Sequence, residues 1–489
     1  MAKVQILYTC QQCGAQARQF FGRCPACGAW NSLVEEQVAA GGGERWPRHR
    51  RPADPSAPAQ ARRARPIVAV GELAQQRIST GFAEFDRVLG GGLVPGSLVL
   101  VGGDPGIGKS TLLLQVTHAL AAHMPVLYAT AEESAQQVKL RWSRLVEPGS
   151  TPDPGPVTAA DHCPAITSVA GEQLHLLAET DLDPVLRELQ SLQPAVAVVD
   201  SIQALHDAEL SSAAGSVAQV RECAAALQRL AKQQNTAVLL VGHVTKEGML
   251  AGPKTLEHLV DAVLTFEGDR FASHRLLRAV KNRFGATHEL GVFEMRDRGL
   301  AEVSNPSELF LSAGEPASGT AVIVACEGTR PLVVELQALV SPTSYASPRR
   351  SATGIASNRL HQILAVLEKH LGLPLSRFDC YLAVAGGLEV VEPAADLGVA
   401  TAVVASHRQL TLPAGTVLIG ELGLGGQLRS VGQMELRLQE AVRMGFSRAV
   451  VPKGSGDCAG LGVIEAATLH EALVASLGDD PGHREEAAG

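Results

Sequence analysis

One glycine-rich segment has the residue types and the spacing that bind a triphosphate. It fits the pattern G-x4-G-K-[ST] and consists of Gly103, Asp104, Pro105, Gly106, Ile107, Gly108, Lys109 and Ser110, followed by Thr111. Glycines let backbone N–H groups turn inward around a phosphate, and the start of the next helix adds the positive end of its dipole. We expect Lys109 to neutralise the β- and γ-phosphates of ATP and the Ser110 hydroxyl to hold Mg²⁺. The alternative, a glycine-rich turn with a chance lysine, is disfavoured by the apolar strand and apolar helix that flank the segment.

Carboxylates at the ends of two apolar runs complete this predicted site. The run Ala195–Val199 ends in Asp200, at the position expected for a second Mg²⁺ ligand, with capping of the next element as the alternative. Glu132 and Glu133 follow the run Val126–Thr130, and one of them is expected to orient and deprotonate the attacking water. Acids are common at strand ends, and the sequence leaves open which of the two acts.

Three polar residues farther along the chain are weaker candidates. His243 follows the run Ala237–Gly242 and is placed to sense the γ-phosphate, although a lone histidine is more often structural. Lys281 and Arg283 belong to the segment Lys-Asn-Arg-Phe-Gly that ends at Gly285. They form either a solvated basic turn or a pair of cations that reaches the triphosphate of a neighbouring subunit, as arginine fingers do.

Four cysteines near the N-terminus have the spacing of a zinc site. Cys10 and Cys13 form one CxxC turn, and Cys24 and Cys27 form a second. Two such turns supply four thiolates to a tetrahedral Zn²⁺, which leaves no position for a catalytic water, so we expect a structural zinc. A redox CxxC is the alternative, but the region lacks a thioredoxin-like βαβ pattern.

The apolar runs that hold these residues are almost unbroken Val, Leu and Ala. Such strands are buried on both faces, as in a parallel sheet covered by helices, so we predict an α/β fold. We expect five parts: a four-cysteine zinc module (1–36), a basic Pro/Arg-rich linker (37–66), the P-loop domain (67–300), a third domain of alternating strands and helices (301–477), and a polar tail (478–489).

Composition limits the class of protein. The 489 residues carry a net charge of −8, which argues against a histone-like DNA coat but not against a local basic surface for nucleic acid. The N-terminus does not resemble a secretory signal, and the longest uncharged window, Ser110–Ala131, contains His118, His123 and Pro125, which disfavours a membrane span. The five cysteines outside the quartet are scattered and suit a reducing compartment. We therefore expect a cytoplasmic globular protein without membrane contact.

Taken in chain order, the motifs resemble the RadA (Sms) family of bacterial DNA repair proteins. The likeness rests on the cysteine quartet, the glycine-rich loop, Tyr128–Ser134, Asp200–Gln203, Gly215–Cys223, Gly242–Gly248 and Lys281–Gly285, and it extends to Asn305–Phe310 and Gly420–Gly423. The resemblance implies a zinc finger, a RecA-like P-loop ATPase with a mostly parallel sheet, and an α+β domain shaped like the proteolytic domain of the Lon protease.

The resemblance also implies an activity and partners. The implied assembly is an ATP-driven hexameric ring that acts as a helicase-like motor on single-stranded and branched DNA. The implied activity is branch migration in homologous recombination, in cooperation with a RecA-type recombinase. ATP, Mg²⁺ and Zn²⁺ are the implied cofactors. The implied residues are Lys109, Ser110 and Asp200 for nucleotide and Mg²⁺, Glu132 or Glu133 for water activation, His243 for sensing, Lys281 and Arg283 for linking ATP turnover to DNA, and Lys246, Lys254, Lys281 and Arg283 for DNA contact.

Two segments depart from the family pattern. Glu147–Gly171 is longer than expected and is predicted to be a surface insertion. Where active Lon-type enzymes have Pro-Ser-Ala-Gly and a downstream lysine, this chain has Pro393-Ala394-Ala395-Asp396 and no lysine from Glu421 to Pro452. Without a hydroxyl nucleophile or an amine base, acyl transfer has no group to activate, so we expect a scaffold and not a peptidase. The alternative function is a RecA-like signalling or clock-type ATPase that switches protein partners without DNA.

Overall fold

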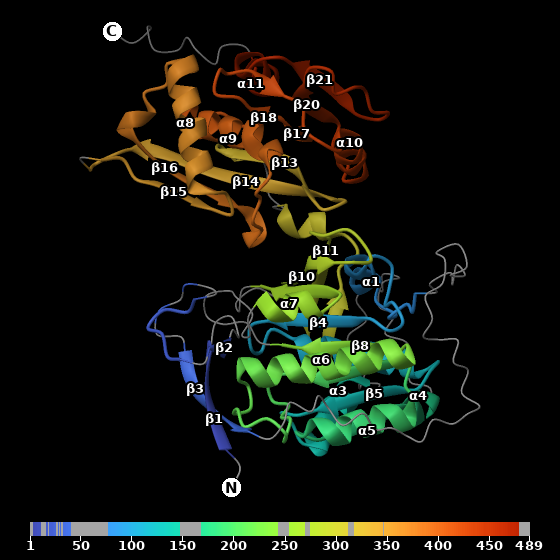
Figure 1. Cartoon of the computed structure of the whole chain (residues 1–489). Helices are drawn as coiled ribbons and strands as arrows, with labels where there is room; N and C mark the ends of the chain where they lie inside the picture. The colour runs from blue at the N-terminus through green and yellow to red at the C-terminus, as the bar shows by residue number, and fades with distance from the viewer. Residues whose placement is uncertain are drawn as a thin grey trace, which may run out of the picture. The chain divides into compact units, whose positions relative to one another are not determined.

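The structure is a computed structural model with two compact units, Met1–Glu302 and Val303–Gly489 (Figure 1). The residues it describes are 3–10, 16–17, 19–25, 28, 30, 33–40, 77–146, 168–242, 254–268, 274–311, 317–345 and 347–478. The border between the units lies beside the domain border predicted at residues 300 and 301. Each unit is described by itself.

The N-terminal segment forms a small antiparallel sheet in the order β2-β1-β3. Its strands are β1 (Lys3–Cys10), β2 (Gln16–Ala17) and β3 (Leu33–Ala40). Strand β3 pairs with β1 over its full length, from Leu33 opposite Cys10 to Ala40 opposite Lys3. The linker predicted to begin at residue 37 therefore begins after Ala40, because residues 37–40 still pair with β1. Residues 41–66 of that linker lie outside the described part of the chain.

The P-loop domain is built on a nine-stranded sheet in the order β12-β11-β10-β9-β4-β8-β7-β5-β6. The strands from β9 to β6 in that order run parallel to their neighbours, whereas β10, β11 and β12 continue antiparallel beyond β9. The strands are β4 (Leu98–Gly103), β5 (Val126–Thr130), β6 (Leu174–Ala178), β7 (Val196–Asp200), β8 (Ala237–Val241), β9 (Ala262–Glu267), β10 (His274–Asn282), β11 (Leu290–Arg296) and β12 (Gly299–Glu302). Every residue of β4, β5, β7 and β8 is buried, as the unbroken apolar runs predicted.

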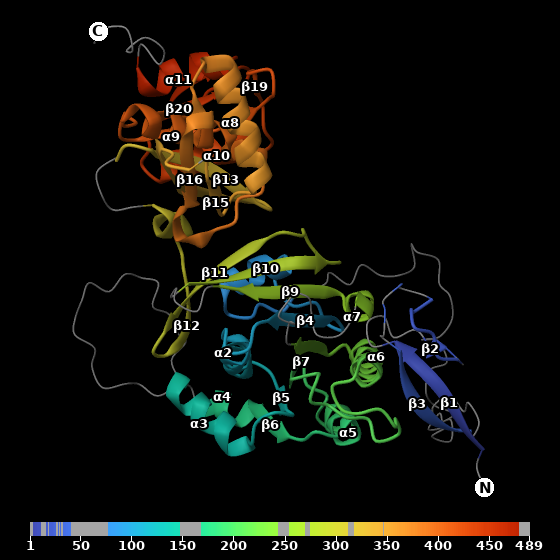
Figure 2. The ribbon, with the colours of Figure 1, turned by 90° about the vertical axis from the view of Figure 1, so that its left-hand side faces the viewer.

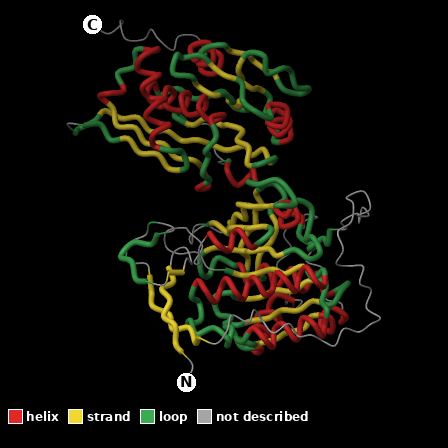
Figure 3. The backbone as a smooth tube through the Cα atoms, viewed as in Figure 1, coloured by secondary structure: helices red, strands yellow, loops and turns green. Residues whose placement is uncertain are grey.

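Two hydrophobic cores cover the two faces of this sheet, because successive side chains on a strand point to opposite faces. Val99 and Val101 pack with α1 (Ala83–Leu89), α2 (Lys109–Ala121) and α3 (Ala135–Val146). Leu98 and Leu100 pack with α5 (Leu182–Leu192), α6 (Val217–Gln234) and α7 (Lys254–Leu259). Figure 2 shows α2 and α6 on opposite sides of the sheet, and Figure 3 shows the strands of this unit lying between helices.

The predicted insertion, Glu147–Gly171, falls mostly outside the described residues, which resume at residue 168. Its last residues form the start of α4 (Ser168–Gln173), which packs against α2 and leads directly into β6. The C-terminal end of the segment is therefore part of the layer of helices on the sheet.

The second unit contains a seven-stranded mixed sheet in the order β15-β16-β14-β13-β17-β20-β21 and a two-stranded sheet, β18-β19. The strands are β13 (Thr320–Glu327), β14 (Arg330–Pro342), β15 (Arg350–Thr353), β16 (Phe378–Val384), β17 (Thr416–Leu418), β18 (Glu421–Leu422), β19 (Leu428–Arg429), β20 (Arg448–Pro452) and β21 (Gly462–Ala466). The helices are α8 (Ser357–Leu371), α9 (Asp396–Arg408), α10 (Met434–Arg443) and α11 (Leu469–Leu477), with 3₁₀ turns at Pro306–Phe310, Leu375–Arg377, Ala385–Gly387 and Pro393–Ala395.

Helix α9 is the central helix of this unit, and the sequence did not reveal it. Its residues from Asp396 to Ala405 are all buried, and a Cβ added at Gly398 would collide with the Ile323 side chain on β13. Val324, the next residue on β13, packs instead with Leu438 of α10 on the other face of the sheet. A helix that is apolar all round has no polar stripe to mark its period, which is why pattern analysis missed it.

Within the described part of the chain, no helix has both the length and the apolar composition required to cross a lipid bilayer.

Candidate active site

The glycine-rich loop joins the end of β4 to the start of α2, and its glycines have positive φ angles that favour glycine. Gly103 has φ 149°, and a Cβ there would lie 2.8 Å from Phe266 Cβ. Gly108 has φ 116°, and a Cβ there would lie 2.9 Å from Met295 Cε. Gly106, at φ 78°, has no atom within 4 Å of an added Cβ, so the loop is open on that side. The loop therefore has the backbone conformation and the open side of a phosphate cradle.

Lys109 is folded over this loop. Its side chain is only 4% exposed, and Nζ donates hydrogen bonds of 2.8 Å to the carbonyl oxygens of Gly103 and Asp104. Burial lowers the pKa of Lys109, and the nearby carboxylates of Asp200, Glu132 and Asp104 oppose that shift. The fold thus gathers a buried cation and several carboxylates at one place, although these residues come from different strands and loops.

Asp200 ends β7 and lies beside the first turn of α2. The carboxylate is 7% exposed and accepts a hydrogen bond from the Tyr128 hydroxyl over 2.6 Å. Burial raises the pKa of Asp200, while the nearby hydroxyl groups of Tyr128 and Ser110 lower it. The structure therefore brings together Ser110 and Asp200, the two residues predicted to hold Mg²⁺. Their hydroxyl and carboxylate oxygens are the ligand types that Mg²⁺ prefers.

The two adjacent glutamates have different partners in the structure. Glu133 forms an ion pair with Arg141 on α3, which holds its carboxylate toward that helix. Glu132 accepts a hydrogen bond from the Ser201 hydroxyl, directly after Asp200, and it is one of the carboxylates that act on the pKa of Lys109. Of the two candidates left open by the sequence, Glu132 is therefore the one placed beside the predicted phosphate and metal groups.

Three of the predicted residues cannot be placed by their side chains. His243 and Lys246 lie outside the described residues. Lys254 is the first residue of α7, and its side chain is outside the described set. All three residues belong to the connection between β8 and β9. This connection starts at the same edge of the sheet as the glycine-rich loop and Asp200.

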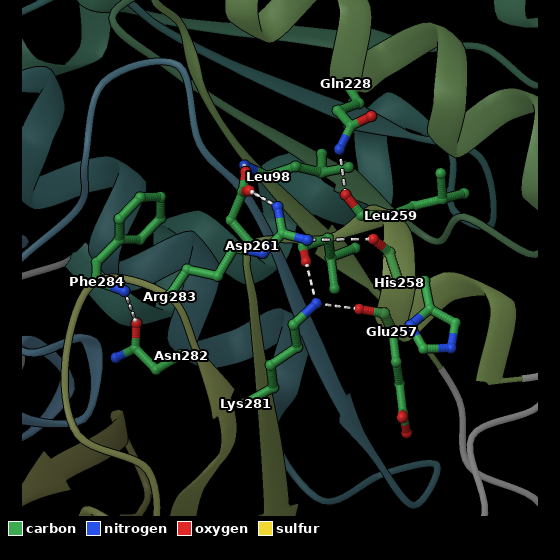
Figure 4. Close-up of polar contacts among 11 residues, drawn as sticks. Leu98, Gln228, Glu257, His258, Leu259, Asp261, Lys281, Asn282, Arg283 and Phe284 are labelled. Carbon is green, nitrogen blue, oxygen red and sulfur yellow. Dashed lines mark hydrogen bonds and ion pairs between the residues drawn. The ribbon is translucent and has the colours of Figure 1, made fainter. Parts of the chain in front are cut away.

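Lys281 and Arg283 are bound by the end of α7 and the residues that follow it (Figure 4). Lys281 Nζ donates to the carbonyl oxygens of Glu257 and Val260, the latter over 2.8 Å. Arg283 pairs with the buried carboxylate of Asp261 over 3.0 Å. The pKa of Lys281 is lowered by burial and by the charge of Arg283. Lys281 is therefore bound at the end of α7, whereas the Arg283 side chain is 49% exposed, so the motif combines one bound cation with one that also faces solvent.

The other residues of this motif have structural partners. Asn282 Nδ2 donates to the carbonyl oxygen of Leu89 at the end of α1, over 3.1 Å. A Cβ at Gly285 would lie 3.0 Å from the Cα of Gly90, so this approach of two backbones requires glycine. Gln228 of α6 adds a hydrogen bond to the Leu259 carbonyl oxygen (Figure 4). The motif therefore links α1, α7 and β10, with Lys281 and Arg283 on the α7 side.

Two of the four predicted zinc ligands can be placed. Cys10, at the end of β1, and Cys24 are 0% and 2% exposed and form a small cluster with Leu33. Cys13 and Cys27 lie outside the described residues. The buried pair fits a site closed to solvent, as a structural zinc requires.

We expect Cys24→Ser to release zinc from the protein, because a hydroxyl is a poor substitute for a thiolate ligand. Metal analysis of the purified chain should give about one zinc per chain for the natural sequence and a clear loss for the variant. Cys223→Ser, at a buried cysteine of α6, serves as the control and should keep the metal. Absence of zinc from the natural sequence would reject the zinc module.

The segment Pro393-Ala394-Ala395-Asp396 is held in place by buried ion pairs. Asp396 is paired with Arg359 and accepts the backbone N–H of Leu422 over 3.0 Å. Glu392 accepts two hydrogen bonds, of 2.6 and 2.5 Å, from Arg437, whose side chain is 3% exposed. These acids and arginines therefore have structural partners in the second unit. Ala394, at the position where the sequence comparison expected the nucleophile of an active Lon-type enzyme, is buried.

Comparison with known families gives three matches along the chain. Residues 8–35 match the rubredoxin metal binding domain, residues 68–249 match the AAA domain, and residues 364–455 match the subunit ChlI of Mg-chelatase. The order agrees with the predicted zinc module, P-loop ATPase and Lon-like domain.

Curated relatives match over nearly the whole chain. The chain is 55% identical to the DNA repair protein RadA of Synechocystis, over 98% of this chain and 95% of that protein. It is 46% identical to the DNA repair protein RadA of Bacillus subtilis, over 98% of this chain and 100% of that protein. The chain belongs to the RadA family of DNA repair proteins. The fold class implied by the resemblance is thereby confirmed for this family member, with its zinc ribbon, RecA-like core and Lon-like domain.

Two solved structures also resemble part of this RadA-family chain. A KaiC-like protein from Pyrococcus horikoshii covers 47% of the chain, with 99% of its own length, 18% identity and a TM-score of 0.35. The RadB recombinase covers 46%, with 99% of its own length, 24% identity and a TM-score of 0.35.

Sequence analysis missed four residues of this region as functional candidates: Tyr128, Arg141, Ser201 and Gln228. Tyr128 and Ser201 lie inside motifs that were recognised as wholes, so their positions were visible but their contacts were not. Arg141 and Gln228 lie on helices and carry no local signal, because their partners come from other elements.

Proposed function

We propose that this RadA-family protein is a DNA-dependent ATPase motor of homologous recombination and repair. The observation that carries the proposal is the meeting of Lys109, Ser110, Asp200 and Glu132 at the carboxyl edge of the parallel sheet. Ligands of open α/β sheets bind at this edge. Family membership supports DNA repair as the setting.

Each residue has a defined task in hydrolysis. The loop N–H groups and Lys109 hold the phosphates. Ser110 and Asp200 would hold Mg²⁺, which when bound would neutralise charge on the transferred phosphoryl group. Glu132 orients the attacking water and accepts its proton. Ser201 orients Glu132 through its hydrogen bond, while Arg141 holds the neighbouring Glu133.

We further propose that the connection from β8 to β9 couples this site to DNA. Lys246, Lys254, Lys281 and Arg283 hold backbone phosphates without reading sequence, which an acidic protein achieves with a locally basic surface. His243 senses the γ-phosphate. In a hexameric ring, Lys281 and Arg283 act on the nucleotide of the adjacent subunit, and the second unit serves as a scaffold. Single-stranded and branched DNA and a RecA-type recombinase are the proposed partners.

The test compares ATP hydrolysis with and without single-stranded DNA for the natural sequence and Arg283→Ala. We expect DNA to stimulate the natural protein, and the variant to lose about 10³-fold or more of the stimulated rate, as removal of an arginine finger does. Asp261 keeps its hydrogen bond to the Leu98 N–H in the variant, so the fold is expected to persist. Branch migration should be lost together with the stimulation.

Arg187→Ala is the matched control, because Arg187 is an exposed arginine in an ion pair with Asp183 on α5. It should hydrolyse ATP and respond to DNA as the natural sequence does. Unchanged branch migration by Arg283→Ala would contradict the role of the motif. Hydrolysis by the natural protein at one rate with or without DNA would favour the signalling-type ATPase.

A further inference from the structure

The Asp200 carboxylate has a hydrogen-bond donor from the neighbouring strand. Tyr128, in the middle of β5, is 1% exposed, and its hydroxyl donates to Asp200 Oδ2 over 2.6 Å. Strands β5 and β7 are adjacent and parallel, and Thr130 lies opposite Asp200. Because side chains two residues apart on a strand point to the same face, Tyr128 and Asp200 meet diagonally on one face of the sheet.

Both partners of this bond need it. A buried tyrosine hydroxyl requires a hydrogen-bond partner, and a buried carboxylate is costly without donors. Tyr128 lines a cavity of about 80 Å³ together with Leu114, Val138 and Trp142, but its side chain is only 1% exposed, so packing holds the ring. The hydrogen bond from the held ring therefore restrains rotation of the Asp200 carboxylate.

We propose that Tyr128 is a positioning residue of the magnesium site. It holds Oδ2 of Asp200, which would leave the other carboxylate oxygen available to bind the metal together with the Ser110 hydroxyl. Ser110 would not be free to hold the carboxylate, because its own hydroxyl is a proposed ligand. The proposal rests on the proposed function, in which Asp200 binds Mg²⁺. Groups that orient a metal ligand from behind affect metal affinity strongly.

The test measures binding of Mn²⁺ to the full-length protein by electron paramagnetic resonance, with a non-hydrolysable ATP analogue present. Tyr128→Phe removes the hydroxyl and keeps the ring. We expect it to weaken Mn²⁺ binding about 10-fold, the usual effect of losing a group that orients a ligand. The Mg²⁺ concentration for half-maximal ATP hydrolysis should rise by a similar factor, and hydrolysis should recover at high Mg²⁺.

The matched control is Thr80→Val. Thr80 is fully buried in the same unit, and its hydroxyl donates to the Asp86 carboxylate over 2.7 Å, so this variant also loses a buried hydroxyl–carboxylate bond. It should bind Mn²⁺ as the natural sequence does, and its melting temperature should fall at least as far as that of Tyr128→Phe. Equal weakening of Mn²⁺ binding by both variants would make the effect one of general stability and overturn the proposal.

Asp200→Asn separates this inference from the function on which it rests. If Asp200→Asn loses Mn²⁺ while Tyr128→Phe binds it as tightly as the natural sequence, Tyr128 does not position the ligand, and the proposed magnesium site stands. If Asp200→Asn also binds Mn²⁺ normally, the magnesium site itself is misplaced, and both proposals fail.

Discussion

Replacing Lys109 by alanine is expected to lower the rate of ATP hydrolysis by about 1000-fold, because one preorganised charge-stabilising donor contributes 10²–10³ and Lys109 also orders the loop. Its ammonium group is buried and bonded to the carbonyl oxygens of Gly103 and Asp104, so it is held at the phosphate cradle. Alanine removes the charge that offsets the developing negative charge of the phosphoryl group. Phosphate release at saturating ATP measures the effect, and a fluorescent ATP analogue measures binding.

Lys232→Ala is the control for loss of a lysine in the same unit. Lys232 lies in the last turn of α6 and is exposed to solvent, so its removal should leave both hydrolysis and nucleotide binding unchanged. Hydrolysis by Lys109→Ala close to the natural rate would show that the glycine-rich loop is not the site of turnover.

Replacing Glu132 by glutamine is expected to lower ATP hydrolysis by about 10²–10⁴-fold while nucleotide binding is retained, the usual contribution of a general base. The amide has nearly the shape of the carboxylate and can still accept a hydrogen bond from Ser201, but it cannot take a proton from water. Single-turnover hydrolysis and equilibrium binding of labelled ATP distinguish the loss of chemistry from a loss of affinity.

Glu133→Gln is a closely matched control, because it makes the same change at the next residue. It weakens the ion pair with Arg141, whose two side chains are about a third exposed, at a cost of about 0–1 kcal/mol in stability. Hydrolysis should stay within a few-fold of the natural rate. The opposite pattern, with Glu133→Gln inactive and Glu132→Gln active, would assign the base to Glu133.

The fold was predictable where burial leaves a pattern in the sequence. Strands β4, β5, β7 and β8 are buried on both faces, and their unbroken apolar runs marked them within one or two residues. The same reasoning failed for α9, since a helix buried on all sides has no periodicity to detect. It also gave no sign that β10, β11 and β12 extend the sheet antiparallel, because strand order depends on pairing across the chain.

The candidate site was likewise predictable from the sequence only in part. Its contiguous parts, the loop from Gly103 to Ser110 and the acid that ends β7, are recognisable because their chemistry depends on residue type and local spacing. The choice between Glu132 and Glu133 depends on Ser201 and Arg141, which reach them from β7 and α3. Neighbouring residues in the sequence do not predict these contacts.

The amino-acid sequence alone determined the nucleotide-binding loop, the paired CxxC turns, the α/β class and the likeness to the RadA family, because each is expressed in neighbouring residues or in motif order. The tertiary structure alone decided which glutamate faces Lys109, that Tyr128 holds Asp200, and that Lys281 and Arg283 are bound at the end of α7. These contacts are made by side chains from separate strands and helices. Strand order and helix packing, not local sequence, decide which of those side chains meet.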